Sequence, residues 1–201
     1  MAARRKQKAP ARRKAARPAA AVQTLSPCLW FDDQAEEAAR FYVSVFPKGK
    51  IVAITRYPAV GQDVHGRAPG SVMTVEFVLN GLAFTALNGG PLFKFNEAVS
   101  MQVLCRTQAE IDYYWEKLSE GGDERARQCG WLKDRFGLSW QVSPIGMAKM
   151  LKDPKSKASE RAFAALLEMK KLDIAALEAA YKGSRQESAR GAAFRRPFSA
   201  R

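Results

Sequence analysis

The most constraining feature of the sequence is a plan of strand, helix and strands that occurs twice. Asp33 and Thr107 each follow a short apolar segment and precede Gln-Ala-Glu, at an offset of 74 residues. Each of the two is placed to cap a helix, with the glutamate returning a hydrogen bond from the third helical position. Gly81 and Gly137 lie in the turns that close the two copies. Because each copy is too small to close its own core, we expect the copies to pair.

The strands of both copies show an alternating pattern. In residues 138–143, Leu, Trp and Val alternate with Ser, Gln and Ser. A two-residue period gives a strand one apolar face, which we expect to pack on a helix, and one polar face, which carries Gln141. We expect Trp131 to close the preceding strand and residues 133–137 to form the turn. Asn80-Gly81 is a hairpin signal between strands at 71–79 and 82–88.

The net charge of +13 is concentrated at the two ends of the chain. Residues 1–23 carry +8, residues 184–201 carry +4, and the body carries only +1. Both tails have too little apolar content to offset the entropy of ordering, so we expect disordered basic tails. The first tail is either a solvated extension or an arm that makes weak contact with nucleic-acid phosphates.

Three cysteines do not form a disulfide framework, which indicates a reducing, cytoplasmic setting. The apolar runs are all shorter than the ~20 residues of a membrane span, so we expect no membrane partner. Residues 24–145 are expected to form the main domain, with modules at about 24–90 and 98–145. Residues 146–183 are expected to be helical, with apolar stripes at 159–172 and 174–181 that serve as packing surfaces.

Four phrases carry a resemblance to a known family. In order they read LWFDDQAEEAARFYVSVFP, SVMTVEF, ALNGGPLFKFNEAVS and CGWLKDRFGLSWQVSP. Together they resemble the PhnB-like branch of the vicinal oxygen chelate superfamily, which includes glyoxalase I, extradiol dioxygenases and fosfomycin-resistance proteins. The resemblance implies an α+β fold of paired βαβββ modules that form an open, cup-shaped barrel, followed by C-terminal helices, in a homodimer.

Enzymes of this superfamily bind a divalent metal at four corners of the cup. Counting from the caps and turn glycines places Ser26, Thr85, Ser100 and Gln141 at these corners. Protein-bound divalent ions normally need imidazole, thiolate or carboxylate ligands, so we expect neither a metal nor another cofactor. His65, the only histidine, is expected to be an exposed loop residue.

The strand alternation also predicts which side chains face the cup. The ligand-pocket candidates are Ser26, Cys28, Trp30, Thr85, Phe93, Phe95, Ser100, Gln102 and Gln141. An apolar wall with a few hydroxyl and amide groups suits an uncharged or weakly polar small molecule. The alternative is that these side chains only fill a closed core.

Three functions therefore stay open. The first is a metal-independent small-molecule-binding protein whose ligand the sequence does not identify. The second is an enzyme, either a metal-dependent relative or a ubiquinone-type methyltransferase, although Gly89-Gly90 leads into Pro91 rather than into the helix that a nucleotide-type loop needs. The third is a nucleic-acid-associated protein acting through its tails. The sequence names no catalytic residue, because no nucleophile–base pair is visible and Glu76 is a lone carboxylate.

Overall fold

The computed structural model describes residues 25–183, so both predicted basic tails lie outside the described residues. The first module forms a four-stranded sheet with the order β1-β4-β3-β2. Its β1 and β4 are parallel, whereas the other neighbours are antiparallel. The elements of this module are β1 (Cys28–Phe31), α1 (Ala35–Val45), β2 (Lys50–Arg56), α2 (Gln62–His65), β3 (Val72–Leu79) and β4 (Leu82–Asn88).

The second module repeats the plan with one strand fewer. Its sheet has the order β5-β7-β6, and the short helix η1 occupies the segment between α3 and β6. Its elements are β5 (Ser100–Cys105), α3 (Gln108–Ser119), η1 (Glu124–Ala126), β6 (Trp131–Lys133) and β7 (Ser139–Pro144). Trp131 therefore opens a strand instead of closing one, and the turn begins at Asp134.

Three helices follow the second sheet: α4 (Met147–Met150), α5 (Lys157–Leu167) and α6 (Ile174–Lys182). They enclose a small core of their own around Leu166, Leu172 and Leu177. Helix α5 ends at Leu167, earlier than the apolar stripe predicts. Phe163 and Leu167 are about half exposed, so the prediction that they belong to a packing surface is wrong. None of the helices in residues 25–183 is long and apolar enough to cross a membrane.

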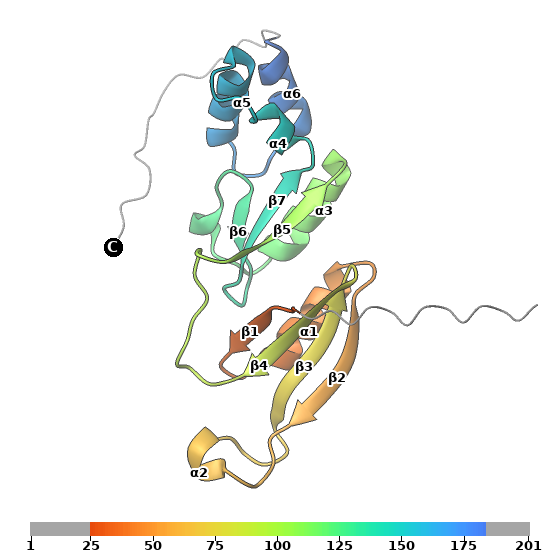
Figure 1. Ribbon diagram of the computed structural model, residues 1–201, viewed down its shortest axis with the longest axis vertical. Helices are drawn as coiled ribbons and strands as arrows, with labels where there is room; N and C mark the ends of the chain where they lie inside the picture. The colour runs from red at the N-terminus through yellow and green to blue at the C-terminus, as the bar shows by residue number, and fades with distance from the viewer. Residues whose placement is uncertain (1–24, 184–201) are drawn as a thin grey trace, which may run out of the picture.

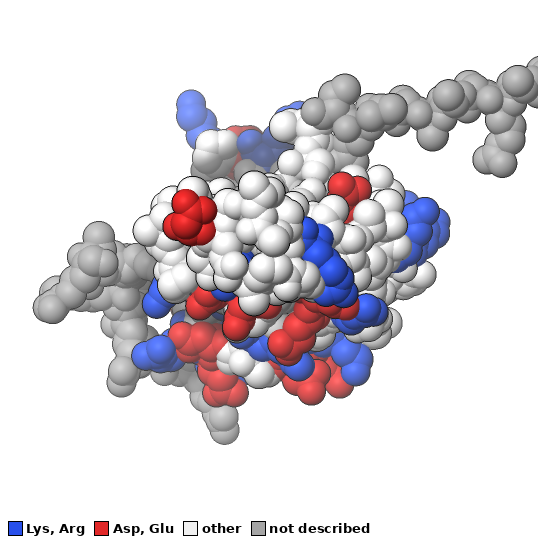
Figure 2. Space-filling view, turned by 90° about the horizontal axis from the view of Figure 1, so that it is seen from below, with Lys and Arg blue, Asp and Glu red and all other residues white. Residues whose placement is uncertain are grey.

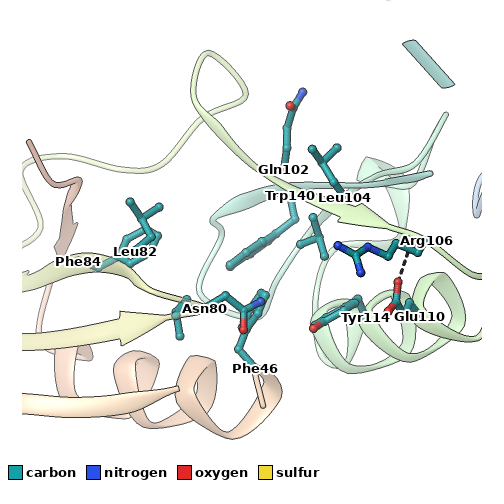
Figure 3. A pocket seen from close by; sticks show the side chains of 12 residues that line it. Phe46, Asn80, Leu82, Phe84, Gln102, Leu104, Arg106, Glu110, Tyr114 and Trp140 are labelled. Atoms are coloured by element: carbon teal, nitrogen blue, oxygen red, sulfur yellow. Dashed lines mark hydrogen bonds between the residues drawn. The ribbon is translucent and has the colours of Figure 1, made fainter. Parts of the chain in front are cut away.

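The two sheets have their helices on the same side (Figures 1 and 3). Val75 and Phe77 of β3 are buried in the core that includes α1, and Trp140 and Val142 of β7 are buried in its continuation toward α3. The opposite faces, which we call the outer faces, carry the alternate side chains. The predicted α+β fold with two strand–helix modules and C-terminal helices is confirmed, and its two sheets stay separate rather than closing into a barrel.

One buried carboxylate joins the two modules. Asp134, 2% exposed, follows β6 and accepts hydrogen bonds from the Tyr42 hydroxyl of α1 and the Trp140 indole of β7, both at 2.8 Å. Its other oxygen accepts the amides of Phe136 and Leu138 at 2.9 and 3.0 Å. Burial raises the pKa of this carboxyl, and the hydrogen bonds oppose that rise.

The helix starts differ from one another. Thr107 caps α3 as predicted, because its hydroxyl accepts the Glu110 amide at 3.2 Å. The predicted Asp33 cap of α1 is wrong, since the helix starts after Gln34 without a side-chain cap bond. The amide side chain of buried Asn88 accepts the Ala35 amide at 2.7 Å instead. The Asn80-Gly81 turn has positive φ at both residues, as its sequence predicts.

Candidate functional site

The outer face of the second sheet carries a row of polar side chains. Ser100 of β5 lies beside Ser139 of β7, which lies beside Lys133 of β6. In the next row, Gln141 of β7 lies between Gln102 of β5 and Trp131 of β6. The Gln141 amide donates to the Ser100 hydroxyl at 2.8 Å, and the Gln102 amide donates to the Gln141 oxygen at 3.4 Å. The structure thus brings together three of the residues that the strand alternation selected.

A cavity of about 380 Å³ opens beside this polar row. Trp131, Lys133 and Ser139 line it from the sheet, and η1 and the segment before β5 form the opposite wall. Glu97 of that segment pairs with the Lys133 ammonium at 2.5 Å, and this contact lowers the pKa of the Glu97 carboxyl. Cys129 also lines the cavity and holds a left-handed backbone with a φ of 52°. The result is a mostly apolar pocket with a neutralised ion pair and a buried hydroxyl.

The outer face of the first sheet carries a second row. Cys28 of β1 lies beside Thr85 of β4, and Thr85 lies beside Glu76 of β3. Cys28 and Glu76 are exposed, and Thr85 is half-buried. This row places a thiol, a hydroxyl and a carboxylate on one uncovered face. Seen from the end that carries α2, the molecule crowds its charged side chains into one half of the view and shows a broad uncharged surface in the other (Figure 2).

The aromatic candidates lie at the end of β1. The Trp30 ring meets the Phe93 ring edge-on with centroids 4.9 Å apart, and the Trp30 indole donates to the Gly90 carbonyl at 2.8 Å. Phe95 packs on buried Phe31 at 5.2 Å. These three predicted residues, Trp30, Phe93 and Phe95, line a cavity of about 310 Å³.

The nine predicted residues do not converge on one cavity within a single chain. Gln102 lines a further cavity between the modules, and Ser26 is exposed ahead of β1, where its hydroxyl lies 3.5 Å from the Pro27 carbonyl. Cys28 and Thr85 share one sheet, whereas Ser100, Gln102 and Gln141 share the other. A ligand that touched both sets would have to span two separate sheets.

The four corner residues do not fit a divalent metal. Ser26 and Thr85 belong to the first module, while Ser100 and Gln141 bond to one another in the second. The Gln141 oxygen already accepts a bond from Gln102. Within residues 25–183, no group of three or more His, Cys, Asp and Glu side chains is placed to hold a metal ion. Three hydroxyls and a neutral amide supply no charge to replace the lost hydration of the ion.

The described residues also give little support for covalent catalysis. Partial burial raises the pKa of the Cys28 thiol, although the residue keeps an exposed surface, and burial raises that of Cys105 to about 11, so neither is poised as a thiolate. The expectation that His65 is exposed is wrong. Its ring is half-buried against Tyr57 at 4.7 Å, and its Nδ1 accepts the Arg67 amide at 3.1 Å.

Sequence reasoning missed Lys133 and Glu97, whose ion pair lies at the 380 Å³ cavity. Lys133 read as part of a turn, and Glu97 lies in a segment without periodicity. The missing signal was the correct start of β6: with Trp131 as its first residue, the alternation puts both Trp131 and Lys133 on the outer face. The ion pair between Lys133 and Glu97 depends on long-range packing that no local pattern contains.

Three solved structures are similar to this chain. The PhnB protein from Bacillus cereus shares 34% identity, with 61% of this chain and 100% of that chain covered and a TM-score of 0.52. A protein from Pseudomonas aeruginosa shares 21% identity, covering 61% and 97% with a TM-score of 0.47. The lactoylglutathione lyase from Agrobacterium tumefaciens shares 17% identity, covering 64% and 96% with a TM-score of 0.34. No curated protein matches the chain.

A family model provides the remaining comparison. The model described as 3-demethylubiquinone-9 3-methyltransferase matches residues 23–143, which contain both modules. The Bacillus cereus protein is matched over its whole length at 34% identity. The predicted resemblance is thereby confirmed: the chain belongs to the PhnB-like family whose model is described as 3-demethylubiquinone-9 3-methyltransferase.

Proposed function

We propose that this protein binds a small, weakly polar organic molecule on the outer faces of its sheets without a metal ion. The observation that carries the proposal is the row of Ser100, Gln102 and Gln141, whose hydrogen bonds leave a polar strip beside an apolar cavity of about 380 Å³. Pockets that are mostly apolar, with a few fixed polar groups, are typical small-molecule sites. The hydroxyl and amide groups give the site its polarity without a net charge.

The proposed unit is a homodimer in which the first sheet of one copy faces the second sheet of its partner. The outer face of the first sheet exposes Cys28 and Glu76, and that of the second sheet exposes apolar Leu104 on its edge strand β5. Burial of such apolar surface favours association. Pairing of this kind would bring the Cys28 row of one copy opposite the Gln141 row of the other, and so unite the two sets of predicted residues around one ligand.

Two other functions are less well supported. The family description names a methyltransferase, but residues 89–99 lie between β4 and β5 without forming a helix, so the glycine pair does not lead into a nucleotide-type loop. Weak nucleic-acid contact through residues 1–23 concerns a segment outside the described residues.

The direct test is a search for small molecules that co-purify with the full chain. We expect an organic ligand to be released on denaturation of the wild type, and to be lost or reduced in Gln141→Leu. The matched control is Gln62→Leu, an exposed glutamine on α2. If the Gln141→Leu protein retains the same ligand in the same amount, the polar row is not the binding site.

A further inference from the structure

We infer that the cavity between the two modules is a second binding site, specific for organic carboxylates with an aromatic or alkyl body. This cavity has a volume of about 350 Å³ and lies between the β3–β4 turn of the first module and β5 and α3 of the second (Figure 3). It shares Gln102 with the polar row of the site proposed above, but the rest of its lining lies at the junction of the modules. We call it the junction pocket.

The floor of the junction pocket is aromatic. Phe46, from the end of α1, packs on Trp140 of β7 with ring centroids 5.7 Å apart and on Tyr114 of α3 at 5.1 Å. Phe84 of β4 and Leu79 of β3 extend this apolar surface from the first module. Phe46, Leu79, Phe84 and Trp140 are buried, which gives the pocket a firm wall for a flat or branched apolar group.

A cationic group points into the pocket from its rim. Figure 3 shows the Arg106 side chain reaching from the end of β5 toward the space between Trp140 and Tyr114. Among the described residues, no carboxylate forms an ion pair with the Arg106 guanidinium. Glu110, the nearest acid in the lining, instead accepts the Arg106 backbone amide at 2.6 Å, as part of the start of α3. The guanidinium donors therefore remain available for an oxyanion.

Neutral polar groups complete the rim. Asn80 lies in the turn opposite Arg106, and a hydrogen bond between its side chain and Tyr114 opposes the rise that burial causes in the pKa of the Tyr114 hydroxyl. Asn80 and Tyr114 both line the pocket, and Figure 3 shows their polar atoms facing one another across its lower edge. An arginine fork together with hydroxyl and amide donors recognises a carboxylate well.

The equivalent position in the other module argues for this specificity. Asp32 lies 74 residues before Arg106, at the equivalent position ahead of α1, and it has the opposite charge. Its carbonyl and carboxylate accept bonds from Arg67 at 2.8 and 3.3 Å, so its charge is matched within the chain. Arg106 has no such partner among the described side chains. A carboxylate ligand would give Arg106 a partner of opposite charge, as Arg67 does for Asp32.

The test uses 2-naphthoate as the probe and 2-naphthylmethanol as its neutral analogue, with binding measured by fluorescence titration of the full chain. The variants are Arg106→Gln, which removes the charge, and Leu82→Trp, which fills the pocket from its partly exposed rim. The controls are Arg56→Gln, on an exposed arginine of β2, and Thr85→Ala, on the outer face of the first sheet.

We expect Arg106→Gln to weaken naphthoate binding about tenfold or more, as loss of a charge-assisted hydrogen bond does, and to leave naphthylmethanol within about twofold. Leu82→Trp should weaken both probes, and the two controls should change neither. Three results would overturn the inference: no saturable naphthoate binding at millimolar concentration, equal binding by Arg106→Gln, or a loss caused by Thr85→Ala instead.

Discussion

The two modules follow one plan, yet they begin their helices by different means. Helix α3 is capped by Thr107, a neighbour in sequence, whereas α1 depends on Asn88, which lies 53 residues away on β4. Asn88 also donates to the Val72 carbonyl at 3.1 Å, so it ties the helix to β3 as well. The comparison teaches that a repeat in sequence preserves the order of elements but not the contacts that secure them.

The two turns that lie between the modules, after β6 and after β3, also differ from one another. The turn after β6 is closed around buried Asp134, which binds Tyr42 of the other module. The turn after β3 uses Asn80-Gly81 and leaves the junction pocket beside it. The turn after β6 therefore holds the modules together through a hydrogen-bonded network, whereas the turn after β3 borders the cavity that we propose as a binding site. The following predictions test this division.

The largest effect is expected for Asp134→Ala. The change leaves two buried side-chain donors, on Tyr42 and Trp140, without their acceptor. Loss of a buried charged partner lowers the free energy of unfolding by about 3–5 kcal/mol. Denaturant unfolding monitored by tryptophan fluorescence measures it. Asp153→Ala is the control, because the substitution at exposed Asp153 removes one side-chain hydrogen bond, in which the carboxylate accepts the Lys155 amide. A loss equal to that of the control would show that Asp134 does not hold the modules together.

Asn88→Ala should have the next largest effect. It removes the acceptor of the buried bond from the Ala35 amide and the donor of the partly buried bond to the Val72 carbonyl. We expect a loss of about 2–3 kcal/mol by denaturant unfolding. Asp33→Ala, at the position that the sequence suggests as the cap, should change the stability by less than about 0.5 kcal/mol. If Asp33→Ala costs more than Asn88→Ala, the local cap governs α1 after all.

Thr107→Ala should cost less, because it removes a single exposed cap bond to the Glu110 amide. The expected loss is about 1 kcal/mol in the free energy of unfolding. Thr107→Ser retains the hydroxyl and should restore most of the stability. Equal destabilisation by the alanine and serine variants would mean that the hydroxyl does not cap α3.

The smallest effect is expected in the dependence of the free energy of unfolding on pH. Burial raises the pKa of Asp134 in the folded state above its usual value of 3.8, so between these two values the folded chain binds more protons than the unfolded chain. The part of the Asp134 contribution that depends on its protonation is therefore fully present below pH 3.8 and is lost as the pH rises through the raised pKa. The free energy of unfolding of the wild type minus that of Asp134→Asn should fall over this window. A rise over the same window would contradict the direction of the shift.

Much of the fold could be predicted because its signals are local. Strand alternation placed Trp140 on the helix side and Gln141 on the outer face, and Asn80-Gly81 identified the first hairpin. The Thr107 cap of α3 could be predicted in the same way. The role of Asn88 at the start of α1 could not be predicted, because an asparagine at the end of a strand does not indicate which distant amide it will accept.

The candidate site was harder to predict for the same reason. Alternation selected Ser100, Gln102 and Gln141, which the structure joins by hydrogen bonds, but it could not show that the first-module candidates lie on a separate sheet. The Glu97–Lys133 ion pair and the Tyr42–Asp134 bond connect segments far apart in sequence. A charged residue in a turn normally reads as exposed, so Asp134 gave no sign of its burial.

Native mass spectrometry of the full chain, purified without added metal or ligand, tests the central claim most directly. It reports the number of copies, any bound metal and any bound organic molecule in a single spectrum. The account predicts a dimer that carries an organic ligand and no stoichiometric divalent metal. A chain that carries one zinc, nickel, iron or manganese ion per copy, released when Gln141 is replaced by Leu, would contradict it.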